Sequence, residues 1–429
     1  MSMCSPTGRW LQVLEQMEGS RGVARSVALC RPEVIPAYPI SPQTHIVEGL
    51  SAMVAGGELT PCEFINVESE FGAMSVAIGA SAVGARTYTA TASQGLLYMA
   101  EALYNASGLG LPIVMTVANR AIGAPINIWN DHSDSMSQRD SGWIQLYVES
   151  NQEAIDTHVL AFRLAEELSL PVMVCMDGFI LTHAYERLDM PEQEQIDSFL
   201  PPFEPRQVLD PDAPVSIGAM VGPEAFTEVK YLAHVKQTQA LEAIPRLAGE
   251  LSQTLGREHV GLVREYRLDD AETVVVALGS VLGTIEDAVD TLREQGVPIG
   301  VLGIKAFRPF PLSKVREVLE GVGRVVVVER ALAVGVGGIV SQDVQVGLAG
   351  TPTQVHTVVA GLGGRSITAD SLSRMLQSAV SGDLEPFTFL DLDHELVERE
   401  LERTRESRQS GPHAENILKD VGVVAAGPV

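Results

Sequence analysis

A turn rich in proline and hydroxyl groups follows a short apolar run near the start of the chain. It reads Tyr38-Pro39-Ile40-Ser41-Pro42-Gln43-Thr44. The prolines restrict the backbone, and Ser41 offers a hydroxyl where a strand would end, which is where ligands bind in open α/β sheets. The same pattern also fits a rigid loop whose hydroxyl caps the next helix. Ser41 is therefore either a ligand-binding residue or a helix cap within a rigid loop.

Polar residues also follow the next two apolar runs. Two carboxylates follow the first of these runs, and a hydroxyl and an amide follow the second. Glu68 and Glu70 lie where a run gives way to a helical pattern. Acidic groups there either serve a function or favour the positive end of the helix dipole, by about 0.3–1 kcal/mol each. Ser93 and Gln94 follow the run 86–90, and a hydroxyl and an amide in that place either line a ligand or cap the following helix.

The elements that would position these residues alternate between strand and helix in two blocks, which is typical of parallel sheets covered by helices. In the first block, strands are expected at 34–38, 64–67, 86–90, 112–117 and 171–176, and helices include 71–84 and 93–107. In the second, strands 273–278, 299–303, 324–329 and 354–360 alternate with helices 283–295, 312–321 and 339–348. The fold class is therefore predicted to be α/β with two parallel-sheet domains.

The blocks divide the chain into five predicted segments. They are an N-terminal segment (1–30), the core of the first domain (31–182), a connector that wraps the surface (183–270), the second domain (271–384) and a charged C-terminal tail (385–429). The connector is rich in proline and acidic residues and contains a mixed helical run at 240–255. The tail includes a helical run, 393–408, that is too polar to sit in a core unaided.

The composition excludes several classes of function. The 30 basic and 55 acidic residues give a formal charge of −25, which repels a phosphate backbone, so nucleic acid is not an expected partner. The sequence has no long apolar run and no signal-peptide pattern, so we expect no membrane association and a cytoplasmic location. Cys4, Cys30, Cys62 and Cys175 are too far apart for a zinc or iron–sulfur site. Any electron-carrying cluster is expected on another chain.

Five motifs occur in the order found in one protein family. They are Tyr-Pro-Ile-Ser-Pro (38–42), Glu-Ser-Glu-Phe-Gly-Ala (68–73), Thr-Ala-Ser-Gln-Gly-Leu (91–96), Ala-Asn-Arg-Ala (118–121) and Asn-Ile-Trp-Asn-Asp-His-Ser-Asp (127–134). Over nearly its whole length the chain resembles the pyruvate and related 2-oxoacid:ferredoxin oxidoreductases, and in particular the separate alpha subunit of their multi-subunit members. The resemblance implies a pyrimidine-type thiamine-diphosphate-binding first domain and a second domain similar to the carboxyl-terminal domain of transketolases.

The resemblance also implies roles for individual residues. Glu70 matches the family glutamate that contacts the aminopyrimidine ring of thiamine diphosphate, where a hydrogen bond to the ring nitrogen favours the tautomer that removes the thiazolium proton. Ser41 replaces the threonine whose hydroxyl contacts the substrate, so it keeps the hydroxyl and loses a methyl group. Arg120 would pair with the 2-oxoacid carboxylate, with an internal salt bridge as the alternative. Ser93 and Gln94 are predicted to bind the cofactor.

The magnesium-diphosphate motif of thiamine enzymes, Gly-Asp-Gly followed by paired asparagines, is absent from all 429 residues. The resemblance therefore implies a beta subunit that supplies Mg²⁺ and the diphosphate half of the site, so that thiamine diphosphate is shared between chains and this chain is inactive alone. A gamma subunit and a ferredoxin-like delta subunit complete the expected assembly, with [4Fe-4S] clusters on the partners.

Two further loops receive no catalytic role. No metal is assigned to the loop Asp131-His132-Ser133-Asp134, which is expected near the active site or at a subunit contact. Residues 335–338, Gly-Val-Gly-Gly, lack the lysine and spacing of a phosphate loop and are expected to form a tight turn.

The implied activity is the reversible, coenzyme A-dependent oxidative decarboxylation of pyruvate to acetyl-CoA and CO₂, with ferredoxin as electron acceptor. Pyruvate is favoured because the Asp-His-Ser-Asp loop is similar to that of the pyruvate enzymes. One alternative is the same reaction on 2-oxoisovalerate, 2-oxoglutarate, an aryl pyruvate or oxalate. A second alternative is a non-catalytic scaffold subunit, and the joint presence of Glu70, Ser41 and Arg120 argues against it.

Overall fold

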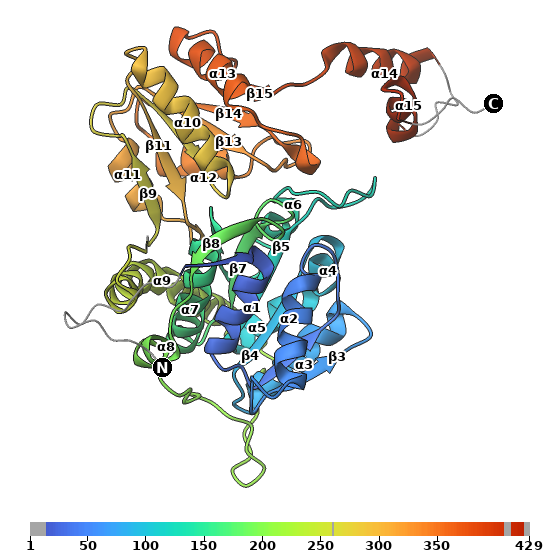
Figure 1. Ribbon diagram of the computed structural model, residues 1–429, viewed down its shortest axis with the longest axis vertical. Helices are drawn as coiled ribbons and strands as arrows, with labels where there is room; N and C mark the ends of the chain where they lie inside the picture. The colour runs from blue at the N-terminus through green and yellow to red at the C-terminus, as the bar shows by residue number, and fades with distance from the viewer. Residues whose placement is uncertain (1–13, 260, 407–412, 424–429) are drawn as a thin grey trace.

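The computed structural model describes residues 14–259, 261–406 and 413–423. Figure 1 shows two α/β bodies, the first sheet with its helices below and the second above, and a pair of C-terminal helices that stands apart from both. Cys4, the start of the predicted N-terminal segment and parts of the predicted tail lie outside the described residues. Within those ranges, no helix is long and apolar enough to span a bilayer.

The first sheet has seven strands in the order β12-β6-β7-β5-β4-β2-β3. The strands are β2 (Val34–Ala37), β3 (Glu63–Asn66), β4 (Thr87–Thr91), β5 (Ile113–Asn119), β6 (Ile144–Tyr147), β7 (Val172–Asp177) and β12 (Ala306–Arg308). Neighbours are parallel except β12 and β6. The chain passes from β2 outward to β3 and then crosses to β4 on the other side of β2. This reversal is a topological switch point, and a ligand crevice is expected at its carboxyl edge.

Helices cover both faces of the first sheet. The helices on one face are α1 (Gly19–Leu29), α2 (Thr44–Ala55), α7 (Asn151–Leu168) and α9 (Phe226–Leu255), and those on the other are α3 (Glu70–Ala82), α4 (Ser93–Tyr98) and α5 (Ala100–Leu109). Because successive strand residues face opposite sides, Val114 packs with the first group while Ile113 and Met115 pack with the second. A two-stranded antiparallel ribbon of β1 (Leu14–Glu18) and β8 (Tyr185–Asp189) and the short helices α6 (Ser133–Ser137) and α8 (Gln193–Phe199) complete this part.

The second sheet has six strands in the order β15-β14-β13-β10-β11-β9, all parallel except β9. The strands are β9 (Val263–Tyr266), β10 (Thr273–Ala277), β11 (Ile299–Ile304), β13 (Arg324–Glu329), β14 (Gln354–Val359) and β15 (Phe387–Phe389). The helices of this part are α10 (Val281–Glu294), α11 (Leu312–Leu319), α12 (Val340–Gly347) and α13 (Ala369–Ser381), followed by α14 (His394–Glu406) and α15 (His413–Asp420).

One apolar cluster joins the two sheets. It runs from the α3 and α5 face of the first sheet to β10, β11 and β13 of the second. Trp143, Tyr147 and Phe307 are fully buried within it, and the rings of Tyr147 and Phe307 meet edge to face with centroids 5.8 Å apart. Strand β12 also crosses from the second block into the first sheet. The two parts are therefore docked through a shared core.

Some elements differ from the sequence expectation. The expected helix 93–107 is two helices, α4 and α5, which meet at Met99. The expected helical run 240–255 is the second half of α9, which begins at Phe226 and contains Pro245. The buried face of this half, which includes Ala240, packs on α7, so this part of the expected surface connector belongs to the core of the first domain. The exposed first half of α9 lacks the apolar periodicity on which the prediction depended.

Candidate active site

The predicted site residues lie at one edge of the first sheet. Ser41 follows β2, Glu70 follows β3, Ser93 and Gln94 follow β4, and Arg120 follows β5. These four strands are neighbours in the order β5-β4-β2-β3, so their carboxyl ends surround the switch point between β2 and β4. The fold thus brings together five residues from four separate segments of the sequence.

Glu70 is the first residue of α3, and its side chain is only 8% exposed. Within the described residues its carboxylate makes no hydrogen bond or ion pair. Gly95 lets the carboxylate lie close to α4, because a Cβ atom on Gly95 would lie only 2.6 Å from Glu70 Oε1 and 2.6 Å from Thr91 Oγ1. Among the described residues Thr91 Oγ1 is itself buried without a hydrogen-bond partner. A buried carboxylate and a buried hydroxyl therefore lie together against Gly95, where a side chain would displace them.

The second carboxylate of this motif has different surroundings. Glu68 is exposed and accepts a hydrogen bond from the Ser69 hydroxyl at 3.3 Å. Ser69 in turn caps α3, since its hydroxyl accepts from the backbone N–H of Gly72 at 3.1 Å. Glu70 and Glu68 thus differ in burial. Without the family resemblance, the sequence alone could not tell which of the two carboxylates is the candidate functional group.

Ser93 is held in the left-handed backbone region, with φ of +50°. Such a conformation costs about 1–3 kcal/mol in a residue other than glycine and persists only where its surroundings enforce it. Here the Ser93 N–H donates to Asp134 Oδ2 at 2.8 Å and its hydroxyl donates to the Ala121 carbonyl at 2.5 Å. The Ser93 hydroxyl also contacts Gln94 Oε1. Gln94 Nε2 makes no hydrogen bond within the described residues, so it is the open polar group of the pair.

Arg120 is 7% exposed, and carbonyl groups fix its guanidinium. Nε donates to the Asn127 carbonyl at 3.1 Å and Nη1 donates to the Ser41 carbonyl at 3.0 Å. Burial lowers the pKa of Arg120, while the charge of Asp134 acts in the opposite direction. Among the described residues no carboxylate forms an ion pair with Arg120, so the internal salt bridge considered above is not present. A buried cation with an unused Nη2 donor favours an anionic ligand.

Ser41 lies next to this guanidinium. Its carbonyl accepts the Arg120 bond, its side chain is exposed, and its hydroxyl makes no hydrogen bond within the described residues. Gly178 allows the turn to approach β5 closely, because a Cβ at that position would lie 2.6 Å from the Pro42 ring and 2.4 Å from the Asn119 carbonyl. The Ser41 turn is thus packed between β5 and the segment after β7.

Asp134 organises the site, and the sequence analysis expected its loop near the active site without giving Asp134 a role of its own. Its Oδ2 accepts from the N–H groups of Ser93 at 2.8 Å and Arg120 at 3.0 Å, and its Oδ1 accepts from Asn119 Nδ2 and the Ser135 N–H, both at 2.8 Å. Burial raises the pKa of Asp134 to about 6, although these donors favour the ionised form. One carboxylate therefore fixes the backbone of two predicted site residues.

The loop that carries Asp134 is held by the second domain. His132 Nε2 lies 2.6 Å from Asp177 Oδ1, and Asp177 Oδ2 also accepts from Arg330 Nη1 at 3.1 Å and from the Ser280 N–H at 2.9 Å. Burial opposes ionisation of Asp177, but His132 and Arg330 lower its pKa below the usual range overall. Asp131 Oδ2 accepts from the Gly363 N–H at 3.1 Å. The loop 131–134 thus lies at the junction of the domains as well as beside the candidate site.

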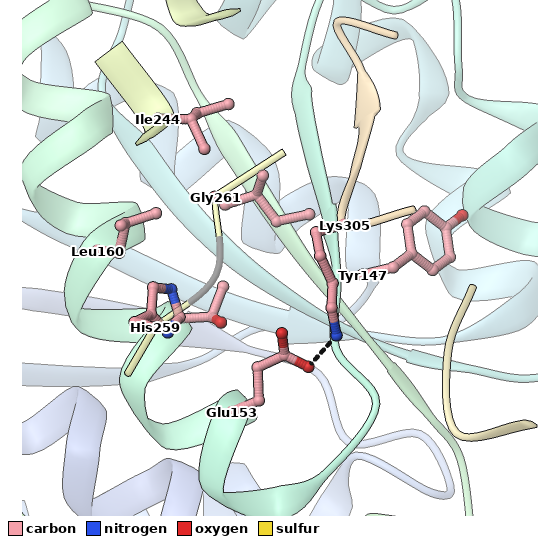
Figure 2. Close-up of a pocket in the computed structure, with 9 residues that line it drawn as sticks. Tyr147, Glu153, Leu160, Ile244, His259, Gly261 and Lys305 are labelled. Carbon is pink, nitrogen blue, oxygen red and sulfur yellow. Dashed lines mark hydrogen bonds and ion pairs between the residues drawn. The ribbon is translucent and has the colours of Figure 1, made fainter. Parts of the chain in front are cut away.

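Two other polar features are structural. Figure 2 shows a pocket lined by Tyr147, Glu153, His259 and Lys305, in which Lys305 Nζ lies 2.7 Å from Glu153 Oε2. No predicted site residue lines it, and burial lowers the pKa of His259 to about 4, so its imidazole is neutral at pH 7. We assign this pocket a structural role at the junction of β12 with α7 and α9.

The glycine-rich segment 335–338 forms a tight turn, as expected. The helix that follows it is closed by the chain's own carboxylate, because Glu329 accepts from the N–H groups of Ile339, Val340 and Ser341 at 2.6, 2.9 and 3.2 Å. A Cβ on Gly338 would overlap Glu329 Oε1. Glu329 therefore takes up three N–H groups of this helix N-terminus, which a bound phosphate would otherwise need.

Comparisons with known proteins agree with this arrangement. Residues 25–248 match the family model described as pyruvate flavodoxin/ferredoxin oxidoreductase, thiamine-diphosphate-binding, and residues 271–372 match pyruvate:ferredoxin oxidoreductase core domain II. Pyruvate synthase subunit PorA of Methanosarcina barkeri is 49% identical over 390 residues, which cover 89% of this chain and 97% of that protein. Ketoisovalerate oxidoreductase subunit VorA of Pyrococcus abyssi is 38% identical over 364 residues, which cover 84% and 92%.

Solved structures support the fold class. A 2-oxoglutarate:ferredoxin oxidoreductase from Magnetococcus marinus superimposes with a TM-score of 0.63 at 19% identity, covering 86% of this chain and 65% of that one. A split-gene transketolase, an inactive beta4 tetramer, superimposes with a TM-score of 0.51 at 16% identity, covering 86% and 99%. The prediction of a thiamine-diphosphate-type domain followed by a transketolase-like domain is confirmed. The chain belongs to the pyruvate:ferredoxin oxidoreductase family.

Proposed function

We propose that this chain is the alpha, PorA-type subunit of a pyruvate synthase, which interconverts pyruvate, coenzyme A and oxidised ferredoxin with acetyl-CoA, CO₂ and reduced ferredoxin. The observation that carries the proposal is the 49% identity to a PorA subunit over 97% of its length, against 38% to a VorA subunit. The site geometry supports a catalytic rather than a scaffold role, because Glu70, Ser41 and Arg120 converge at one sheet edge and each keeps a polar group that has no partner among the described residues.

The residues around Glu70 fit the aminopyrimidine ring of thiamine diphosphate. A buried carboxylate without a protein partner can hold a hydrogen bond to a ring nitrogen and so set its protonation state. Thr91 Oγ1 lies with Glu70 against Gly95, and Gln94 Nε2, which lies beside Gly123, offers a further polar contact. When bound, thiamine diphosphate supplies the nucleophilic carbon that attacks the 2-oxo group and accepts the electrons that CO₂ leaves behind.

Arg120 and Ser41 would bind the substrate. The unused Nη2 donor of Arg120 can pair with the 2-oxoacid carboxylate, and the two carbonyl bonds on Nε and Nη1 keep the guanidinium plane fixed while it does so. The free hydroxyl of Ser41 lies on the turn that contacts this guanidinium and can donate to the substrate. Serine in place of the family threonine keeps this donor and leaves room for about one more methyl group.

The diphosphate half of the site belongs to a partner in this proposal. The chain lacks the Gly-Asp-Gly motif, so a beta subunit would hold Mg²⁺ and the diphosphate. Gamma and ferredoxin-like delta subunits, the latter with [4Fe-4S] clusters, would carry electrons onward. Calorimetry tests the shared site: thiamine diphosphate should bind weakly to this chain alone and tightly, with magnesium dependence, to the assembled complex. Tight magnesium-dependent binding by the chain alone would contradict the two-chain arrangement.

Substrate competition tests the activity itself. The chain is produced together with the subunits encoded beside it, and coenzyme A-dependent ferredoxin reduction is measured with pyruvate, 2-oxoisovalerate and 2-oxoglutarate. We expect the highest kcat/KM with pyruvate. A preference for 2-oxoisovalerate would assign the chain to the VorA type instead, and an assembled complex that turns over none of these 2-oxoacids would support the scaffold alternative.

A further inference from the structure

A second cluster of ligand-type side chains lies outside the candidate active site. It consists of Glu18 at the end of β1, His45 in the first turn of α2 and His183 after β7. One ligand atom from each of the three lies within 4.8 Å of the others. The sequence separates these residues widely, and none of them belongs to the motifs that point to the 2-oxoacid chemistry.

The buried carboxylate of this cluster needs a cation. Glu18 is 7% exposed, and its contact is His45 Nδ1 at 2.6 Å from Oε1. Within the described residues no lysine or arginine forms an ion pair with Glu18. A buried carboxylate is costly unless a positive charge compensates it. Among the described residues Glu18 contacts His45, whereas a metal ion would engage all three side chains.

His183 is oriented as a ligand would be. Its Nδ1 lies 2.7 Å from the Thr182 hydroxyl, and that hydroxyl accepts from the Phe179 N–H at 2.8 Å. This contact leaves Nε2 of His183 available, and imidazoles that bind metals are commonly held through their other nitrogen in this way. The ring of His183 lies between those of His45 and Phe179, with both centroid distances at 4.8 Å. Packing therefore fixes the ring on both sides.

We propose that Glu18, His45 and His183 bind a divalent transition-metal ion, Zn²⁺ in the first place. A carboxylate and two imidazoles are a donor set that suits zinc, with bonds of about 2.0–2.2 Å, and they leave a coordination position for water. Ligand atoms in a tetrahedral zinc site are about 3.3 Å apart. Small side-chain rotations convert the present spacing to that geometry.

The ion would act as a clamp. Glu18 ends β1 and pairs with Tyr185 at the start of β8, and His183 lies two residues before Tyr185, so both stand at one end of the antiparallel ribbon of β1 and β8. His45 lies in α2, which begins directly after the Ser41 turn. The metal would thus tie the ribbon to the helix that carries the Ser41 turn at its start. This role is independent of the reaction proposed above.

Metal titration of the purified chain tests the site. The tag-free full chain is stripped with a chelator and titrated with Zn²⁺ against a chromophoric competitor, and with Co²⁺ followed by visible absorption. We expect one high-affinity equivalent, and a rise in Tm on addition of Zn²⁺. His45→Ala and His183→Ala should each weaken zinc binding by roughly 100-fold or more, because even the partners that only orient metal ligands contribute 10- to 100-fold.

Matched variants separate this site from other histidines. His234→Ala, on the exposed first half of α9, should bind zinc as the wild type does. Glu18→Gln keeps the side-chain volume and should also lose the site. Failure of the wild-type chain to bind zinc, or zinc binding that survives in both histidine variants, would overturn the proposal. Circular dichroism confirms that each variant is folded, and the wild-type titration decides the question if one is not.

Discussion

Gly95 offers a way to disturb Glu70 without altering its chemistry. A methyl group at position 95 would lie 2.6 Å from both Glu70 Oε1 and Thr91 Oγ1, closer by roughly 0.8 Å than the 3.4 Å at which ordinary contacts begin. Thr91 is fully buried in the central strand β4, so the flexible end of Glu70 is the group that moves. Gly95→Ala therefore keeps the carboxylate and displaces it.

The expected effects on stability and activity can be estimated separately. Overpacking costs about 1–3 kcal/mol, but alanine in place of glycine within α4 returns up to about 1 kcal/mol of helix propensity. The net loss of unfolding free energy should be about 0–3 kcal/mol. A displacement of nearly 1 Å at a group that must align with the cofactor can lower the rate by roughly 10²-fold, which is about 2.7 kcal/mol of activation free energy. Because folded domains are stable by about 5–15 kcal/mol, the variant should stay folded and the fall in rate should be measurable.

Gly79→Ala provides the matched control, because it lies in α3 like Glu70 and a Cβ there meets nothing within 4 Å. The assay is pyruvate-dependent viologen reduction by the assembled complex at saturating thiamine diphosphate, together with thermal unfolding of each variant. We expect kcat to fall in Gly95→Ala alone, with little change in the KM for pyruvate, since Arg120 and Ser41 are untouched. Equal kcat values in both variants would show that the position of the Glu70 carboxylate has no catalytic importance.

Three further predictions test the remaining groups. Glu70→Gln should slow turnover by at least about 10²-fold with assembly preserved, and an equal effect from Glu68→Gln would contradict the assignment. Arg120→Lys should raise the KM for the 2-oxoacid far more than that for coenzyme A, because an ammonium cannot replace the fixed guanidinium plane; equal changes would indicate a structural role. Burial lowers the pKa of His158 to about 4 from 6.5, so the unfolded chain takes up a proton first and the unfolding free energy should fall by roughly 3 kcal/mol between pH 6.5 and 4. Urea unfolding should show a shallower fall in His158→Gln than in His234→Gln, and equal falls would contradict this reading.

The strands that carry the site were predictable because each one is short, contains apolar or β-branched residues and is followed by polar residues. Strand β4 was expected at 86–90 and observed at Thr87–Thr91, and its buried side chains explain why the pattern was clear. Strand β12 was not predicted, since three residues (Ala306–Arg308) carry no periodic signal and their pairing partner β6 is far away in the sequence. Local sequence patterns thus predict which segments are buried, but they do not predict which distant strands pair with each other.

The same distinction applies to the site. Ser41 and Glu70 were candidates because each follows an expected strand, and the family resemblance gave them and Arg120 their predicted roles. The fold places all three together at the switch point. Which partners these side chains have depends on residues far away in the sequence. The guanidinium of Arg120, for example, donates to the Ser41 carbonyl, and no sequence pattern predicts this contact. Ser93 was predicted to bind the cofactor, but in the structure its hydroxyl donates to the Ala121 carbonyl and so also has a structural role. Its cofactor contact stays a prediction.

Asp134 explains why the second domain matters although it contributes none of the proposed catalytic residues. The carboxylate of Asp134 holds the N–H groups of Ser93 and Arg120, so the position of its loop determines where both residues stand. That loop is held in turn by Arg330, whose carbonyl accepts from the His132 N–H at 2.9 Å and whose guanidinium reaches Asp177. A shift of the second sheet would therefore be transmitted to Arg120 through two hydrogen-bonded steps. The second domain therefore positions the proposed substrate-binding residues, because the buried bonds that fix them begin on it.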